Sequence, residues 1–249
     1  MPIILYKNRL ETPLQALDSL RLAKPELAGQ KLSYAGRLDP MAEGVMVVLV
    51  GEENKDRETF LGLPKTYRTE IIFGLYTDTG DSLGRVVSCD AEAGSRMTEE
   101  EVKKLLPKYI GKFEQPYPAF SSKSFAVAGS FEKVQDNVNA GEMEPLSHEV
   151  EVHSIELLGM KKIPAADLLQ KVRTEIPLVQ GNFRQGEIVD RYEKVLAAAN
   201  MTFSVMELRL SVSSGFYVRQ FATDFGSALS IVREKVGDWT VEKGEVKVL

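Results

Sequence analysis

The sequence has 249 residues, of which 43% are hydrophobic and 27% charged, enough for a sizeable core in one large domain or two small ones. Its single cysteine, Cys89, excludes an intramolecular disulfide, and two histidines are too few for a Cys/His zinc cluster. With 31 Lys plus Arg against 36 Asp plus Glu, the net charge is −5, which by itself argues against a nucleic-acid partner because phosphates attract positive charge.

The chain also carries no sequence signal for a membrane or for export. Its longest uninterrupted apolar run, 45–50, is far shorter than a membrane span. The first residues lack the basic start and the long apolar stretch of a signal peptide. We therefore expect a protein of the cytoplasm, a reducing compartment, without membrane contact.

The N-terminal third predicts a helix, a strand and a second helix. Thr12 followed by a proline and by leucines at helical spacing predicts a helix over about 13–23. The apolar run 45–50 predicts a strand that is buried on both faces, and 52–61 is expected to form the helix after it.

The next third begins with another expected strand. The β-branched and aromatic residues of 66–73 predict it, and the stretch 77–84 has turn chemistry throughout. Further on, Thr98 and Glu101 form a capping box in front of an apolar helical face.

The C-terminal half contains one stretch of weak periodicity. We interpret 127–149, which is polar, as a mobile loop or helical lid. Apolar residues over 188–199 then define a helical face, and 203–214 alternate as in a strand. Gly215 breaks that strand, and the apolar residues of 218–229 predict a further helix.

This order of elements bears on fold class and domain count. Strands and helices are interspersed without a regular βαβ repeat, which favours an α+β fold over a doubly wound sheet. No low-complexity linker divides the chain. We therefore expect a single domain over 1–249.

The most informative stretch is Gly-Arg-Leu-Asp-Pro-Met-Ala-Glu-Gly at 36–44, which runs straight into the apolar strand. A proline after Asp39 keeps that residue out of the helical region, and glycines on both sides allow another backbone or a ligand to approach closely. An Asp-Pro pair is most often a tight turn capped by its own carboxylate. The alternative is a catalytic carboxylate at the mouth of a buried strand.

A second stretch, Gly-Phe-Tyr-Val-Arg at 215–219, places Arg219 at the start of the last predicted helix. A helix N-terminus disfavours cations, so an arginine there is most often solvated. If Arg219 is instead buried, it requires a carboxylate partner.

The third stretch is Lys65-Thr66-Tyr67-Arg68, an aromatic residue among cations at the start of a strand. Such interleaving suits stacking on a base while phosphates are neutralised. For Tyr67 taken alone, an ordinary core tyrosine is the simpler interpretation.

Together these stretches resemble the TruB family of pseudouridine synthases. The family's Gly-x-Leu-Asp-Pro-x-Ala-x-Gly motif stands at 36–44, its Lys-x-Tyr-Arg segment at 65–68 and its Thr-Asp-Thr-x-Asp-x-x-Gly segment at 77–84. Pro-Ala-Phe-Ser-Ser-Lys at 118–123 is similar to a further family segment with one residue missing, and 215–219 is similar to Gly-Thr-Tyr-Ile-Arg. The five motifs occur in the family's order and cover most of the chain.

The resemblance implies a pseudouridine synthase fold, α+β, with a central mixed, mostly antiparallel sheet flanked by helices and loops. It implies Asp39 as the catalytic aspartate, Tyr67 as the ring that stacks on the target base, and Arg219 as the ion-pair partner of Asp39. It further implies RNA-binding residues, which we place at Tyr34, Arg37, Lys65, Arg68, Lys123 and Tyr217. The expected substrate is RNA, most simply uridine 55 in the T-arm of transfer RNA, and we expect a monomer that needs no metal or other cofactor.

Some positions depart from the family pattern. Tyr34 stands where many members have a histidine, and the sequence does not continue into the C-terminal RNA-binding PUA domain of many relatives, so we expect no separate PUA domain. Two alternatives follow: a pseudouridine synthase acting on another RNA such as ribosomal RNA, or a non-catalytic RNA-binding or RNA-folding protein on the same scaffold.

The motifs also change how the net charge is interpreted. Cations lie in or beside them, whereas acidic residues concentrate elsewhere, for example over 142–151 and 187–193. We expect a basic cleft on an acidic body, with salt-sensitive RNA binding.

Overall fold

The structure is a computed structural model that describes residues 2–121, 146–197 and 201–248. Within these ranges nine strands form one sheet, in the order β11-β1-β3-β10-β4-β9-β8-β7 with β2 paired to β3. The strands are β1 (Ile3–Lys7), β2 (Leu32–Ala35), β3 (Ala42–Val50), β4 (Lys65–Phe73), β7 (Gly111–Pro116), β8 (Ser147–Pro164), β9 (Thr202–Val212), β10 (Gly226–Val236) and β11 (Val246–Val248). All pairs are antiparallel except β3 with β10, so the expected α+β fold with a mixed, mostly antiparallel sheet is confirmed.

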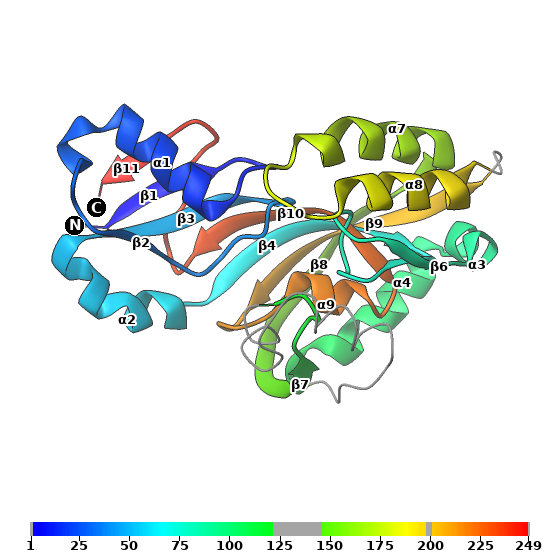
Figure 1. The fold of residues 1–249 in the computed structure, drawn as a ribbon. Coiled ribbons are helices and arrows are strands. Elements are labelled where there is room, and N and C mark those ends of the chain that lie inside the picture. The colour runs from blue at the N-terminus through cyan, green and yellow to red at the C-terminus, as the bar shows by residue number, and fades with distance from the viewer. Residues whose placement is uncertain (1, 122–145, 198–200, 249) are drawn as a thin grey trace.

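Helices cover both faces of this sheet (Figure 1). They are α1 (Pro13–Ala23), α2 (Arg57–Gly62), α3 (Ala91–Arg96), α4 (Glu99–Leu105), α7 (Ala165–Glu175), α8 (Gln185–Leu196) and α9 (Val218–Ala222). In Figure 1, α7 and α8 lie together above the sheet, α4 and α9 lie below it, and α1 and α2 flank the strands near the two termini. A two-stranded sheet of β5 (Leu75–Thr77) and β6 (Val86–Cys89) lies between α8 and the central sheet.

The core follows from the alternation of apolar residues along the central strands. Met206, Leu208 and Leu210 of β9 point into one cluster, which α4 and α9 complete. Phe203 and Val205 of the same strand belong to a second cluster, under α7 and α8. The sheet is thus buried on both sides at its centre, where Ile71 and Ile72 of β4 contribute to opposite clusters.

Several predicted elements are confirmed. The helix over 13–23 is α1, and the Thr12 hydroxyl accepts the backbone N–H of Gln15 at its start. The strand at 45–50 is the second part of β3, and the one at 66–73 is β4. Thr98 caps α4 through the expected capping box.

Two predicted helices need correction. Over 52–61 the chain first forms a 3₁₀-helix, Gly51–Asp56, and becomes α-helical only in α2. The helix over 218–229 ends at Ala222, because Gly226 opens β10 between β3 and β4. Apolar residues at 225, 228 and 229 fit either period, and pairing with β4 decides for the strand.

The predicted lid falls mostly outside the described residues. Of 127–149, residues 127–145 lie outside them, and Ser147–Glu149 begin β8, paired with Gln115 and its neighbours in β7. Within the described residues, no helix is long and apolar enough to cross a membrane.

Candidate active site

Asp39 lies on a turn that joins β2 to β3. Its backbone carbonyl accepts the N–H of Ala42 at 2.9 Å, which closes the turn. The N-terminal segment holds the next three carbonyls: the N–H of Leu10 donates to Pro40 O at 2.7 Å, Arg9 Nη1 to Met41 O at 2.8 Å and Lys7 Nζ to Ala42 O at 2.6 Å. The backbone that carries the Asp39 carboxylate and continues into β3 is therefore held in place by the N-terminal segment.

The partner of this carboxylate is Arg219. Its Nε donates to Asp39 Oδ2 at 2.7 Å, and its Nη1 donates to Thr79 O at 2.7 Å. The arginine side chain is 6% exposed and that of Asp39 34%, so the pair has a buried cation and a carboxylate that reaches open space. The ion pair that the resemblance implied is present in the structure.

A second carboxylate, Asp81, lies beside the same guanidinium. Its Oδ2 is 3.7 Å from Arg219 Nε, while its Oδ1 accepts the hydroxyl of Thr79 and the N–H of Leu83. Burial raises the pKa of Asp81, against the opposing effect of Arg219. Burial disfavours the Arg219 cation, but Asp39 and Asp81 outweigh it and raise its pKa. The guanidinium is thus held charged between two carboxylates.

The loop 77–84 brings Asp81 to this position. Gly80 has φ +75°, and a Cβ there would lie 2.6 Å from the carbonyl oxygen of Arg219, so the loop can touch α9 only through a glycine. The neighbouring Asp78 accepts Nη1 of Arg184 at 2.7 Å and Nε of Arg85 at 3.2 Å. Asp78 and Asp81 therefore serve the loop and Arg219, as expected of acidic side chains in such a turn.

Asp39 lies where two cavities meet. The larger, about 530 Å³, is lined by residues of the Asp39 turn, β4, the 213–219 segment and β10. The smaller, about 300 Å³, is lined by apolar side chains, among them Pro13, Tyr34 and Phe183, together with as many polar and charged ones. Asp39, Arg37 and Arg219 line both. A ligand in either cavity therefore reaches the carboxylate.

The larger cavity receives two side chains from β4. Lys65 and Tyr67 line it, since residues two apart on a strand share a face. Burial lowers the pKa of Lys65 to about 8, and the nearby charge of Arg233 adds to the decrease. Lys65 Nζ donates to the carbonyls of Leu61 and Leu63, each at 2.6 Å.

Arg233 of β10 donates hydrogen bonds to the segment that contains the Asp39 turn. Its Nε donates to Val45 O at 2.7 Å and its Nη2 to Gly36 O at 3.1 Å, at the two ends of the 36–45 segment. Gly44 pairs with Arg233 across β3 and β10, and a Cβ on Gly44 would lie 2.2 Å from the Arg233 carbonyl oxygen. The second glycine of the motif is thus required by the close approach of β10.

Tyr217 lies at the far side of the larger cavity, at the start of α9. The buried Gln115 fixes its backbone: Oε1 accepts the Tyr217 N–H at 2.8 Å, and Nε2 donates to its carbonyl at 3.1 Å. The ring meets Tyr117 and His148 edge to face, and these two stack on each other at 4.1 Å. Burial, with Tyr117 and Asp39 nearby, raises the pKa of Tyr217.

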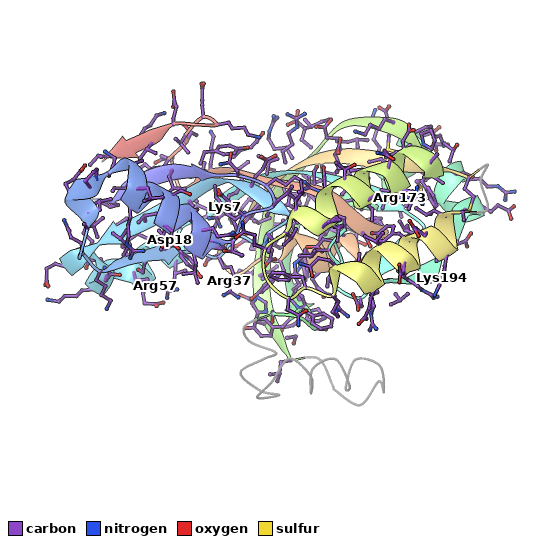
Figure 2. The ribbon with its side chains drawn as sticks, turned by 45° about the horizontal axis from the view of Figure 1, so that its top comes forward. Lys7, Asp18, Arg37, Arg57, Arg173 and Lys194 are labelled. Carbon is purple, nitrogen blue, oxygen red and sulfur yellow. The ribbon has the colours of Figure 1, made fainter. Side chains whose placement is uncertain are left out.

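The structure brings most of the predicted site residues together. Asp39, Tyr67, Arg219, Arg37, Lys65 and Tyr217 line the larger cavity, and Tyr34 lines the smaller. Arg37 is exposed and lies between the α1 side and the α8 side of the molecule (Figure 2).

Two predicted RNA-binding residues are not placed there. Arg68 does not belong to the expected basic cleft, because the alternation along β4 turns it to the opposite face, where it pairs with Glu207. Lys123 lies outside the described residues.

Sequence reasoning missed the roles of Asp81 and Arg233. The sequence predicts Asp81 as a residue of the turn and of the family segment at 77–84, and not as a neighbour of Arg219, although Gly80 beside it signals a close backbone approach. Arg233 lies beyond the predicted C-terminal helix. It is the first of three charged residues in a row, and this pattern gives no sign of a buried cation.

The fold defined by these elements is found in solved structures. The crystal structure of a Cbf5–Nop10–Gar1 complex superimposes with a TM-score of 0.56 at 14% identity, covering 97% of this chain and 50% of that one. The structure of an H/ACA RNP bound to a substrate RNA containing 2′-deoxyuridine gives 0.52 at 14% identity, covering 97% and 49%. The expected pseudouridine synthase fold is thereby confirmed.

Comparison of the sequence with known proteins identifies the family of the chain. A family model described as TruB family pseudouridylate synthase (N terminal domain) matches residues 24–183, and the chain belongs to that family. It is 27% identical over 218 residues to tRNA pseudouridine synthase B of Aquifex aeolicus, covering 88% of this chain and 60% of the relative. It is 24% identical over 248 residues to the enzyme of the same name from Thermotoga maritima, covering 97% and 64%. The chain thus spans less than two thirds of the length of these relatives.

Proposed function

We propose that this chain is an RNA pseudouridine synthase with Asp39 as its catalytic carboxylate. The substrate that we propose is uridine 55 in the T-arm of transfer RNA. The observation that carries the proposal is the 2.7 Å ion pair of Asp39 with buried Arg219 at the meeting of two cavities. The transfer RNA in the names of the relatives supports the substrate class.

The reaction requires little beyond a positioned carboxylate and room for the base. The N1–C1′ bond of uridine breaks, the uracil turns, and a C5–C1′ bond forms; C5 loses a proton and N1 gains one, so the atoms balance without an oxidant, a reductant or net hydrolysis. An ionised carboxylate is suited to act at the sugar or the base as nucleophile or base. A cavity of about 530 Å³ has room for a nucleotide.

The surrounding residues fit this chemistry. Arg219 is a positioning residue, since its guanidinium fixes the Asp39 carboxylate and is itself fixed by Thr79 and Asp81. Tyr67 offers a ring on the wall of the same cavity for the displaced base. Exposed Arg37 and buried Lys65 add the positive charge that an RNA backbone requires.

The test is the variant Asp39→Asn, which keeps the size of the side chain and removes its charge. We expect a more than thousandfold loss of pseudouridine formation on a T-arm hairpin, with RNA binding and thermal unfolding close to those of the wild type. Product is measured by carbodiimide modification and primer extension. An Asp39→Asn protein that still forms pseudouridine at a tenth of the wild-type rate contradicts the role of Asp39.

Asp18→Asn is the matched control, because Asp18 lies exposed on α1, away from both cavities (Figure 2). Parallel assays on unmodified transfer RNA and on ribosomal RNA fragments identify the substrate. If the protein modifies only the ribosomal fragments, its substrate is ribosomal RNA and not transfer RNA. A wild-type protein that makes no pseudouridine on either RNA would favour a non-catalytic RNA-binding protein.

A further inference from the structure

The larger cavity is lined by more positive than negative side chains. It is lined by Arg37, Arg57, Lys65, Arg219 and Arg233 against Asp39 and Glu58. Arg219 pairs with Asp39, and Arg57 lies 3.6 Å from Glu58. Among the residues that the structure describes, the other three cations have no carboxylate within salt-bridge distance, and two of them are buried.

Arg233 is the first of these buried cations. It is 1% exposed, and carbonyls accept its Nε and Nη2. Its Nη1 has no acceptor in the described parts of the chain, although a guanidinium has five N–H groups to donate. The arginine therefore reaches the cavity wall with donors to spare.

Lys65 is the second, and it is 5% exposed. Two carbonyls accept hydrogen bonds from its ammonium group, which has three N–H donors, so one donor remains. The charge of Arg233 is close enough to help lower the pKa of Lys65. Two like charges thus share one buried wall, an arrangement that an anion between or beside them would relieve.

The chemistry of this wall selects a phosphate group. A guanidinium edge beside an ammonium is the usual arrangement for binding phosphate oxygens. If a uridine is bound with its base against Tyr67, its own backbone must pass along the same cavity, because Lys65, Tyr67 and Arg233 all line it.

We propose that Lys65 and Arg233 form a phosphate-binding subsite that takes one phosphodiester next to the target nucleotide. The subsite rests on the proposed function for its ligand. In binding RNA it would also couple the substrate to the Asp39 turn, because Arg233 holds both ends of that turn.

The experiment replaces single phosphodiesters of a T-arm hairpin with uncharged methylphosphonates, one position at a time around the target uridine. Affinity for the wild-type protein is measured by fluorescence anisotropy at fixed salt. We expect one linkage to weaken binding about tenfold, the loss of a charge-assisted hydrogen bond, and its neighbours to have much smaller effects. If no single linkage weakens wild-type binding more than twofold, the subsite does not exist.

The variant Lys65→Gln then tests whether Lys65 contacts that linkage. Glutamine can still donate to the carbonyls of Leu61 and Leu63, which favours folding. We expect Lys65→Gln to bind the unmodified hairpin about tenfold more weakly and to lose sensitivity to the critical methylphosphonate, while Lys65→Arg keeps it. A Lys65→Gln protein with the full wild-type sensitivity overturns the assignment.

Lys161→Met is the matched control, since Lys161 pairs with Glu70 on the opposite face of the sheet. It should keep the wild-type sensitivity to the critical linkage. A second measurement distinguishes a phosphodiester of RNA from free phosphate as the ligand: inorganic phosphate is exchanged for chloride at constant ionic strength, and thermal unfolding is followed. Thermal stabilisation by phosphate without any critical RNA linkage would assign the wall to free anions and reject a phosphodiester.

Binding is measured without turnover, so the subsite and the proposed function fail separately. A critical linkage coupled to Lys65 in a wild type that makes no pseudouridine supports the subsite and rejects the enzyme. Pseudouridine formation without a critical linkage supports the enzyme and rejects the subsite.

Discussion

The two faces of β4 differ sharply in how their charges are balanced. On one face Lys65 and Tyr67 line a cavity, and the partners of Lys65 among the described residues are carbonyls. On the other face Arg68 and Glu70 lie opposite Arg209 and Glu207 of β9, so that like charges face each other directly. The structure resolves this by ion pairs to other residues: Arg68 to Glu207, Glu70 to Lys161, and Arg209 to Glu156 and Glu234.

This difference shows what each face is suited for. The charged side chains of the ion-paired face are partly exposed and neutralise one another, so these pairs contribute little stability and attract no ligand strongly. The cavity face leaves positive charge unpaired, which costs stability unless an anion binds there. Adjacent residues of one strand can therefore carry the same sign of charge and have opposite roles.

After Asp39→Asn, the largest expected effect is at Arg219 of α9, which lines the same cavity as Lys65 and Tyr67. Arg219→Lys should lower kcat for pseudouridine formation on the order of a thousandfold, because one ammonium cannot donate to Asp39 and to Thr79 in the same geometry. RNA affinity should change less than threefold. Single-turnover assays with Arg173→Lys as control separate the two quantities, and an equal loss in kcat and affinity would make Arg219 a general RNA contact.

The next effect concerns pH and stability. The folded-state pKa of Lys65, about 8, lies below its ordinary value of 10.5, so the unfolded chain binds more protons between these values. The wild type should gain unfolding free energy relative to Lys65→Gln as pH rises from 8 to 10.5, by up to about 3 kcal/mol. Urea unfolding at several pH values measures this. With Lys161→Met as reference for the loss of a lysine, a difference that falls or stays flat contradicts the burial of Lys65 as a cation.

A smaller effect, on RNA affinity, is expected from the aromatic ring of Tyr67. Tyr67→Leu should weaken binding of the T-arm hairpin about tenfold, because an aliphatic side chain stacks poorly on a base. Tyr67→Phe should bind within twofold of wild type, and any decrease in its kcat then reports on the hydroxyl. Equal affinities for the Leu and Phe variants would place the base elsewhere.

The smallest effect belongs to the ion-paired face. Glu207→Gln removes the partner of the half-exposed Arg68 and should lower the free energy of unfolding by less than about 1 kcal/mol, with RNA affinity unchanged within twofold. Thermal and urea unfolding check the first statement, and anisotropy the second. A tenfold change in affinity would show that this face also meets RNA.

The sequence predicts the parts of the site that lie close together along the chain. The Asp39 turn between its glycines, the buried strand after it and Tyr67 on the next strand all carry local signals of turn chemistry and β propensity. The pairing of Asp39 with Arg219 came from the family resemblance, since nothing local tells one arginine 180 residues away from another.

What could not be predicted depends on tertiary pairing. Residues 225–229 fit a helix or a strand, and the pairing of this segment with β4 decides for the strand. Because the sequence predicts a helix there, it does not predict the role of Arg233, which depends on the position of β10 beside the Asp39 turn. Arg68 was misplaced for a simpler reason: its neighbour Tyr67 faces the cavity, so the alternation of a strand already excludes it.

The three carbonyls of 40–42, held by residues 7–10, have a consequence for the order of assembly. They connect parts of the chain about 30 to 35 residues apart, a short loop with a small entropic cost of closure. Arg219 joins Asp39 across 180 residues and is synthesised long after the turn. A nascent chain can therefore form the hydrogen bonds that support the carboxylate early, but the arginine that completes the ion pair is added about 180 residues later.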